Sequence, residues 1–176
     1  MLRKPLIVLG ILSGILLAIL GTLALIGTSL SEDHHSVAEE TLPYSIEKTW
    51  SYVSNIEDQA RWNHSITKVE LVEGSKNMWK ETYHSGDSMT YETLEVLAPN
   101  KLVRRIADEN APFQGKWTIM LSYVNDDKTK VTVVEDGSIK NPFLRFMVHK
   151  VIGLEKFQRN YLNSLQEGMA GDLASK

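Results

Sequence analysis

The sequence contains no cysteine. Because there is no thiol, disulfide bonds, thiolate metal sites and cysteine catalysis are all excluded. The sequence also lacks a phosphate-binding loop, a dinucleotide-binding glycine pattern and the sharp-turn serine motif of the α/β-hydrolases. These absences argue against a nucleotide-dependent enzyme or a serine hydrolase, and we expect no cofactor.

A basic surface is missing as well. The formal net charge is −3, and two of the cationic residues, Arg3 and Lys4, stand at the extreme N-terminus, so the rest of the chain is more acidic still. Nucleic acids and anionic lipid headgroups both require a basic face on the proteins that bind them. We therefore expect no nucleic-acid partner.

Charge is absent altogether between Pro5 and Ser31. A helix of that length spans ~40 Å at about 1.5 Å per residue, enough to cross a hydrocarbon core of ~30 Å with some tilt. A cleaved signal peptide is the competing interpretation, but its apolar core is shorter, about 7–15 residues. We favour a retained anchor over residues 1–31. Small residues on one face of this helix (Gly10, Gly14 and Ala18) also allow a weak homodimer.

The charges that flank this segment predict its orientation. Arg3 and Lys4 precede the apolar run, and acidic residues follow it. Lysine and arginine are retained on the cytoplasmic side of membranes. The sequence therefore predicts a single-pass membrane protein with a cytoplasmic N-terminus and an extracytoplasmic domain.

The rest of the chain divides into a linker over 32–36, a domain over 37–170 and a tail over 171–176. A first strand is expected over 37–42, then two short helices after Pro43 with Ser45 as an N-cap. Runs rich in Val, Thr, Tyr and Trp, separated by short turn signals, predict six further strands near 66–73, 78–85, 88–97, 101–108, 115–125 and 129–138. Asn141 and Pro142 then open a helix to about residue 169. This order predicts an α+β domain with a curved antiparallel sheet of about seven strands wrapped on a long C-terminal helix.

Four stretches of this pattern resemble the helix-grip fold of the START-like superfamily, also called SRPBCC, which includes the polyketide cyclase/dehydrase and lipid-transport proteins. The residues that carry the resemblance are Leu42 to Trp50, Asn55 to Trp62, Phe113 to Thr118 with Lys128 to Val133, and Tyr161 to Leu165. Together they cover nearly all of 37–169. The resemblance implies a cavity between sheet and long helix that holds an apolar compound, but it brings no shared catalytic residue.

We expect this cavity to be lined by strand aromatics, one arginine and the buried stripe of the long helix. The candidate ligand-binding residues are Trp79, Tyr83, Tyr91, Arg104, Trp117, Ile119, Met147, Val151, Leu154 and Tyr161. Arg104 and Arg105 are adjacent in a strand, so one of them must face inward and needs an acidic partner or a ligand carboxylate. Edge placement or pairing with Glu135 are equal alternatives for Arg104.

The histidines give no support for a metal site. His34 and His35 lie in the expected linker, where a solvated segment outside the membrane is the favoured interpretation. His64 and His84 have no helical partner at the spacing that zinc sites use.

The function that we expect is non-catalytic binding of an apolar small molecule or lipid by a membrane-anchored domain. Two alternatives stay open. One is an enzyme of the cyclase, dehydratase or hydrolase type, for which Tyr83, Tyr91, Arg104 and Glu135 are the polar candidates. The other is a packed partner-binding domain without a cavity.

Overall fold

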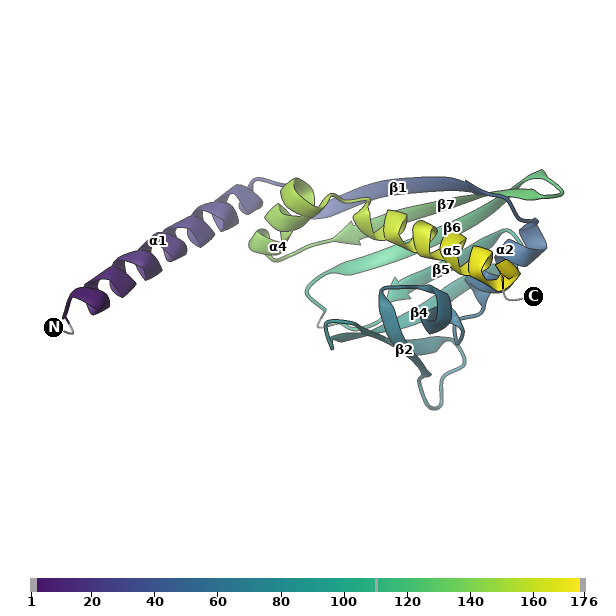
Figure 1. Ribbon diagram of the computed structural model, residues 1–176, viewed down its shortest axis with the longest axis horizontal. Helices are drawn as coiled ribbons and strands as arrows, with labels where there is room; N and C mark the ends of the chain where they lie inside the picture. The colour runs from purple at the N-terminus through teal and green to yellow at the C-terminus, as the bar shows by residue number, and fades with distance from the viewer. Residues whose placement is uncertain (1–2, 110, 175–176) are drawn as a thin grey trace.

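Seven antiparallel strands form one curved sheet with the spatial order β1-β7-β6-β5-β4-β3-β2. A computed structural model describes residues 3–109 and 111–174. A long helix lies across one face of the sheet, and the N-terminal helix extends away from one end of it (Figure 1). The strands are β1 (Asp33–Leu42), β2 (Ile66–Leu71), β3 (Met78–Tyr83), β4 (Ser88–Leu97), β5 (Lys101–Ile106), β6 (Gln114–Asn125) and β7 (Lys128–Ser138). The helices are α1 (Arg3–Thr28), α2 (Ile46–Ser54), α3 (Gln59–Trp62), α4 (Pro142–Phe146), the π-helical η1 (Met147–Ile152) and α5 (Lys156–Ala174).

The predicted α+β class, the antiparallel sheet and the C-terminal helix are confirmed. Two of the predicted helix starts are also capped as expected. Ser45 Oγ accepts from the Lys48 backbone N–H at 3.3 Å, and Asn141 Oδ1 accepts from Leu144 N–H at 3.0 Å. These side chains satisfy backbone donors that have no partner within the helix.

The expected linker over 32–36 is wrong, because the first strand already starts at Asp33. Asp33 of β1 pairs with Ser138 of β7, and the pairing of the two strands continues without a break to Leu42, which lies opposite Thr129. The backbone N–H of Ile139 extends the ladder by one more bond, to Glu32 O at 2.9 Å. The chain therefore passes almost directly from α1 into the sheet.

The single long helix predicted from Pro142 is interrupted. α4 and η1 form one arm, and α5 begins again after Gly153, whose φ of 90° is a conformation that favours glycine. The break changes the direction of the chain, and Val151 is 62% exposed. Val151 was expected in the buried stripe and in the cavity, and this expectation is wrong because the stripe assumed an uninterrupted helix.

The hydrophobic core fills the part of the concave face under α5. Ala38, Val133, Ile119 and Leu102 are neighbours across β1, β7, β6 and β5, and all are buried. Leu162, Leu165 and Met169 of α5 pack on this apolar half of the sheet. Gly168 approaches so closely that a Cβ there would lie 2.4 Å from the Cβ of Trp62.

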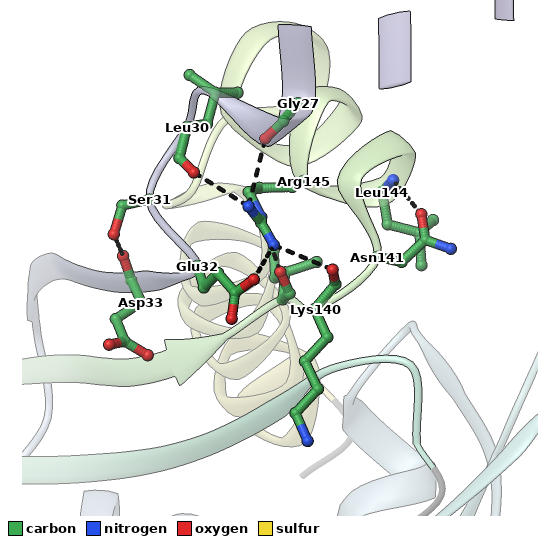
Figure 2. Close-up of polar contacts among 10 residues, drawn as sticks. Gly27, Leu30, Ser31, Glu32, Asp33, Lys140, Asn141, Leu144 and Arg145 are labelled. Atoms are coloured by element: carbon green, nitrogen blue, oxygen red, sulfur yellow. Dashed lines mark hydrogen bonds and ion pairs between the residues drawn. The ribbon is translucent and has the colours of Figure 1, made fainter. Parts of the chain in front are cut away.

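Arg145 connects α1 to the domain (Figure 2). Its side chain is 4% exposed and donates to two carbonyls at the end of α1, Gly27 O at 3.4 Å and Leu30 O at 3.1 Å. The same guanidinium donates to Ile139 O at 2.9 Å and Lys140 O at 3.0 Å, and it forms an ion pair of 2.7 Å with Glu32. One arginine thus joins the end of α1 to the segment after β7. At Gly27 O it adds to the bond that the Leu30 backbone N–H also donates, at 3.2 Å.

Replacing Arg145 by alanine is expected to destabilise the full-length protein by about 2–4 kcal/mol, since several charge-assisted hydrogen bonds are lost and buried carbonyls lose their donor. Urea unfolding in detergent micelles, followed by near-ultraviolet circular dichroism, measures this loss. Arg159→Ala is the matched control. Arg159 is exposed and bonded only to Glu155 among the described residues, so its loss should cost at most about 0.5 kcal/mol. Equal effects of the two changes would contradict the role given to Arg145.

Candidate functional site

The concave face changes from apolar to polar toward the end of the sheet that adjoins α1 and α4. Next to the apolar row stands a row made by Ser36, Glu135, Trp117 and Arg104, which are direct neighbours across β1, β7, β6 and β5. All four point to the same side as the core residues, because side chains two apart on a strand share a face. Two ionisable side chains, Glu135 and Arg104, therefore face the interior.

The next row is nearly free of side chains. His34 on β1 is opposite Gly137 on β7, which is opposite Gly115 on β6. The His34 ring lies over Gly137, where a Cβ would come within 2.6 Å of it, whereas a Cβ at Gly115 would meet only ordinary contacts at 3.7 and 3.8 Å. An open hollow of about 650 Å³ lies here, at the ends of β1, β5, β6 and β7. His34, Ile106 and Gly115 line it from the concave face, and the other face of the sheet contributes side chains such as His35, Lys116 and Asp136.

A cluster of titratable groups lies at the hollow. His34 is 5% exposed, and its Nε2 lies 3.4 Å from Glu135 Oε1. Burial raises the pKa of Glu135, while the contact with His34 and the nearby Trp117 indole act in the opposite direction. His149 of η1 meets the His34 ring edge-on, with centroids 6.5 Å apart. Burial, followed by the charge of His34, lowers the pKa of His149.

A second buried network extends across β3 and β4. Glu81 accepts from the Trp79 indole N–H at 2.9 Å and from the Tyr83 hydroxyl at 3.3 Å, and Tyr83 in turn is hydrogen-bonded to Tyr91. Burial raises the pKa of Glu81, opposed by the Trp79 hydrogen bond and the charge of Arg104. Burial also raises the pKa values of Tyr83 and Tyr91, so both hydroxyls stay protonated.

Arg104 connects the sheet to α5. Its guanidinium donates to Val53 O and to the Tyr161 hydroxyl, both at 3.3 Å, and lies 5.9 Å from the centre of the Trp79 ring. The inward orientation predicted for one of the two arginines is therefore found at Arg104, whereas Arg105 is exposed and paired with Glu92. Pairing of Arg104 with Glu135 is not what the structure shows, because Glu135 contacts His34 instead.

Several buried polar atoms on this face have no hydrogen-bond partner within residues 3–109 and 111–174. They are His34 Nδ1, Arg104 Nε, Glu135 Oε2, His149 Nε2 and Gln158 Oε1. An unsatisfied buried polar atom costs about 1–3 kcal/mol. Their grouping around the polar half of the concave face provides hydrogen-bonding capacity of both kinds, donor and acceptor, for another molecule.

The structure brings most of the predicted site residues together. Trp79, Arg104, Ile119 and Tyr161 are buried, and Tyr83, Tyr91 and Trp117 are partly buried beside them. Met147 and Leu154 are half-buried on either side of the helix break. That these residues bind a ligand remains a prediction.

The site residues predicted from the sequence did not include Glu81, His34, His149 or Gln158. Alternation alone was a sufficient signal for Glu81, because it lies between Trp79 and Tyr83 on one face of β3. His34 was assigned to a solvated linker, which is wrong because β1 includes it. In the described part of the chain, no three His, Asp or Glu side chains are grouped as metal ligands would be.

Glu135→Gln is expected to change how the stability of the domain depends on pH. Because burial raises the pKa of Glu135 above its ordinary 4.5, the folded state binds this proton more tightly than the unfolded state. The resulting stability is present below the unfolded pKa and is lost as pH rises through the raised one. The glutamine variant avoids that loss. Its free energy of unfolding should therefore rise relative to the wild type as pH increases from 4.5 toward neutrality, in urea titrations of the two proteins.

Glu39→Gln is the control for this titration, because Glu39 is an exposed carboxylate of the same sheet that is paired with a lysine. The hydrogen bond with Lys130 lowers the pKa of Glu39 below 4.5. Over the same pH interval this control variant should differ from the wild type by a nearly constant amount. A constant difference for Glu135→Gln as well would show that its carboxyl is not perturbed by burial.

Comparisons with known proteins agree on the fold. The chain is similar to a START superfamily protein from Mycobacterium smegmatis, with 14% identity and a TM-score of 0.64, over 78% of this chain and 98% of that one. It is also similar to an aromatase/cyclase from Streptomyces sp. R1128, with 14% identity, a TM-score of 0.60 and coverage of 80% and 93%. A third similar structure is norcoclaurine synthase from Thalictrum flavum, with 10% identity, a TM-score of 0.61 and coverage of 77% and 85%. These likenesses are in the fold alone.

Among curated protein sequences, no significant match is found. The sequence profile of one family, described as polyketide cyclase / dehydrase and lipid transport, matches residues 33–170. This range begins at the first residue of β1 and extends into α5, so it includes the whole sheet and the polar hollow. The chain therefore belongs to the polyketide cyclase/dehydrase and lipid-transport family of helix-grip proteins.

Proposed function

We propose that this protein binds an amphipathic small molecule or lipid in the polar hollow, while α1 holds it in a membrane. The observation that carries the binding proposal is the group of unsatisfied polar atoms beside the glycine row, led by Glu135 Oε2 and Arg104 Nε. A fully packed partner-binding domain would not combine an open hollow with polar atoms that lack partners. The volume of about 650 Å³ falls within the usual range of small-molecule sites, about 300–1,000 Å³.

The lining defines the chemistry of the ligand. Ile106 lines the hollow and offers apolar surface, and the aromatic rings of Trp117 and Trp79 lie deeper on the same face. Glu135 Oε2, Gln158 Oε1 and Arg104 Nε are buried, so a ligand reaches them only when the side chains that cover them move. A ligand hydroxyl can then donate to either oxygen, and a ligand carbonyl or carboxylate can accept from Arg104 Nε. A rigid or aromatic apolar compound with polar groups at one end matches this arrangement better than a saturated hydrocarbon does.

Membrane attachment rests on α1. The candidate span within this helix, Ile7–Thr28, has a mean hydropathy of 2.5, and none of its most apolar window is buried. Cleavage after the small residues near Gly27 would remove the Gly27 carbonyl to which Arg145 donates and the end of α1 that packs against Pro142, which supports an anchor that is retained. We retain the predicted orientation, with a cytoplasmic N-terminus and an extracytoplasmic domain. A weak dimer through the small residues of α1 stays a prediction.

The second candidate function is acid–base catalysis in the same hollow. It is favoured by the raised pKa of Glu135 and by the neighbouring imidazoles of His34 and His149. A carboxyl with a raised pKa can donate its proton to a leaving hydroxyl, and an adjacent imidazole can accept a proton from carbon. Such an arrangement would suit a dehydration or cyclisation of the bound compound.

Filling the hollow should abolish ligand binding without unfolding the protein. Gly115→Leu adds a side chain where the first carbon has only ordinary contacts. Ser122→Leu adds the same side chain to an exposed position on the same strand and is the matched control. Native mass spectrometry of the full-length protein, released from detergent, should show a bound apolar compound in the wild type and in Ser122→Leu but not in Gly115→Leu. A compound that stays bound to Gly115→Leu would place the site elsewhere.

Glu135→Gln separates the two candidate functions. For a binding protein, the variant should hold the same compound as the wild type with changed occupancy. For an enzyme, the variant should hold a compound of different mass, such as an unreacted substrate heavier by one water, because the proton donor is missing. The absence of any bound compound from all variants, together with no uptake from a panel of isoprenoids, fatty acids and aromatic polyketides, would overturn both candidates.

A further inference from the structure

The length of α1 determines where its last turns lie. Beyond Arg3 and Lys4, α1 carries no charge up to its end at Thr28. At about 1.5 Å per residue this stretch is ~36 Å long, a few ångströms more than a hydrocarbon core of ~30 Å. If the helix spans the bilayer, its last turn is therefore at the boundary between acyl chains and headgroups.

α4 packs against this last part of α1. Gly27 is buried there, and any side chain in its place would collide with the Pro142 carbonyl. Leu23 and Ala24, one turn earlier on the same face, are half-buried as well. Arg145 then fixes the contact through its bonds to Gly27 O and Leu30 O (Figure 2). Because these contacts hold α4 beside the end of α1, α4 lies at the same depth as the membrane boundary.

The segment that continues from α4 exposes large apolar side chains. Val151 and Ile152 in η1 are 62% and 40% exposed, and Phe157 at the start of α5 is 50% exposed. Lys140, Lys150 and Lys156 stand among them and are exposed too. Between residues 140 and 159 the only acidic residue is Glu155, in a chain whose net charge is −3. Apolar side chains interspersed with lysines are typical of helices that lie in a membrane interface.

We propose that residues 142–157, here called the docking segment, rest in the headgroup region of the bilayer that holds α1, with Val151, Ile152 and Phe157 inserted toward the acyl chains. The partner is this lipid surface. This inference rests on the anchoring role proposed for α1. In addition, the domain is held at a fixed orientation on the membrane, because α1 and the docking segment both attach it.

The orientation has a consequence for the hollow. Its rim is formed by Asp33 and His34, which follow α1 closely in the chain, and by Gly137 and Ser138, which shortly precede α4. His149 of the docking segment lies edge-on against the His34 ring at that rim. The mouth of the hollow therefore opens beside the bilayer, and an amphipathic ligand passes between membrane and protein without crossing bulk water.

Single cysteines test this placement, because the chain contains no other thiol. Val151→Cys and Phe157→Cys, labelled with an environment-sensitive fluorophore, report on the docking segment of the full-length protein in phosphatidylcholine/phosphatidylglycerol vesicles. Val124→Cys is the matched control: Val124 is also exposed and apolar, but it lies near the β6–β7 turn at the other end of the sheet. Leu17→Cys, in the middle of α1, reports on the anchor. The vesicles contain phospholipids brominated either near the glycerol or near the methyl end of the acyl chains.

The labels at 151 and 157 should show blue-shifted emission and should lose intensity with bromine near the glycerol. The label at 17 should be quenched by bromine near the methyl end, and the label at 124 by neither lipid. Quenching at 17 without quenching at 151 and 157 would overturn the docking segment and leave the anchor intact. Equal quenching at 124 and 151 would also overturn it, since the domain would then have no fixed orientation. No quenching at 17 would contradict the anchor itself.

Discussion

The apolar side chains on the concave face of a curved sheet must be covered by other parts of the chain, and the rest of the domain depends on this requirement. α5 supplies Leu162, Leu165 and Met169 to the apolar half, where Val133, Ile119 and Leu102 meet them. Beyond that half the sheet continues for two more rows, but the filling changes to polar side chains and then to glycine. The hollow lies at the row that contains Gly115 and Gly137. The His34 ring covers Gly137, so Gly115 is the glycine of this row that leaves space beside it.

The C-terminal helical region is interrupted between η1 and α5. Gly153, with its φ of 90°, redirects the chain, so that η1 covers the rim through His149 while α4 reaches α1. π-helical turns occur frequently at functional sites, and here one separates the arm bound to the anchor from the helix that fills the core. Arg145 holds that arm, because it binds the carbonyls of both segments that it joins.

Most of the fold could be predicted because its signals are local. Alternating β-branched and aromatic residues marked six strands, and Asn141-Pro142 marked a helix start. The errors occur where tertiary contacts override composition. Residues 33–36 are polar enough to look like a linker, yet their pairing with β7 makes them strand. Gly153 is an isolated glycine whose effect depends on its φ, which a sequence does not reveal. The negative net charge of the chain likewise gives no indication of the lysines around η1, because an average over the chain carries no information on position.

The site was harder to predict than the fold for a physical reason. Trp79, Arg104 and Trp117 were identified because large side chains on the strands of a small domain are commonly buried in its interior. His34, Glu81 and Gln158 are ordinary surface residues elsewhere, and only the closure of the sheet around α5 buries them. Burial leaves several of their polar atoms without partners, which lowers the stability of the ligand-free protein. A ligand that satisfies those atoms recovers this free energy, so ligand binding and folding stability are coupled. The unsatisfied polar groups that lower the stability of the ligand-free domain are thus the ones that select a ligand with polar atoms at one end. A purely apolar molecule would bind only through its contacts with the apolar lining.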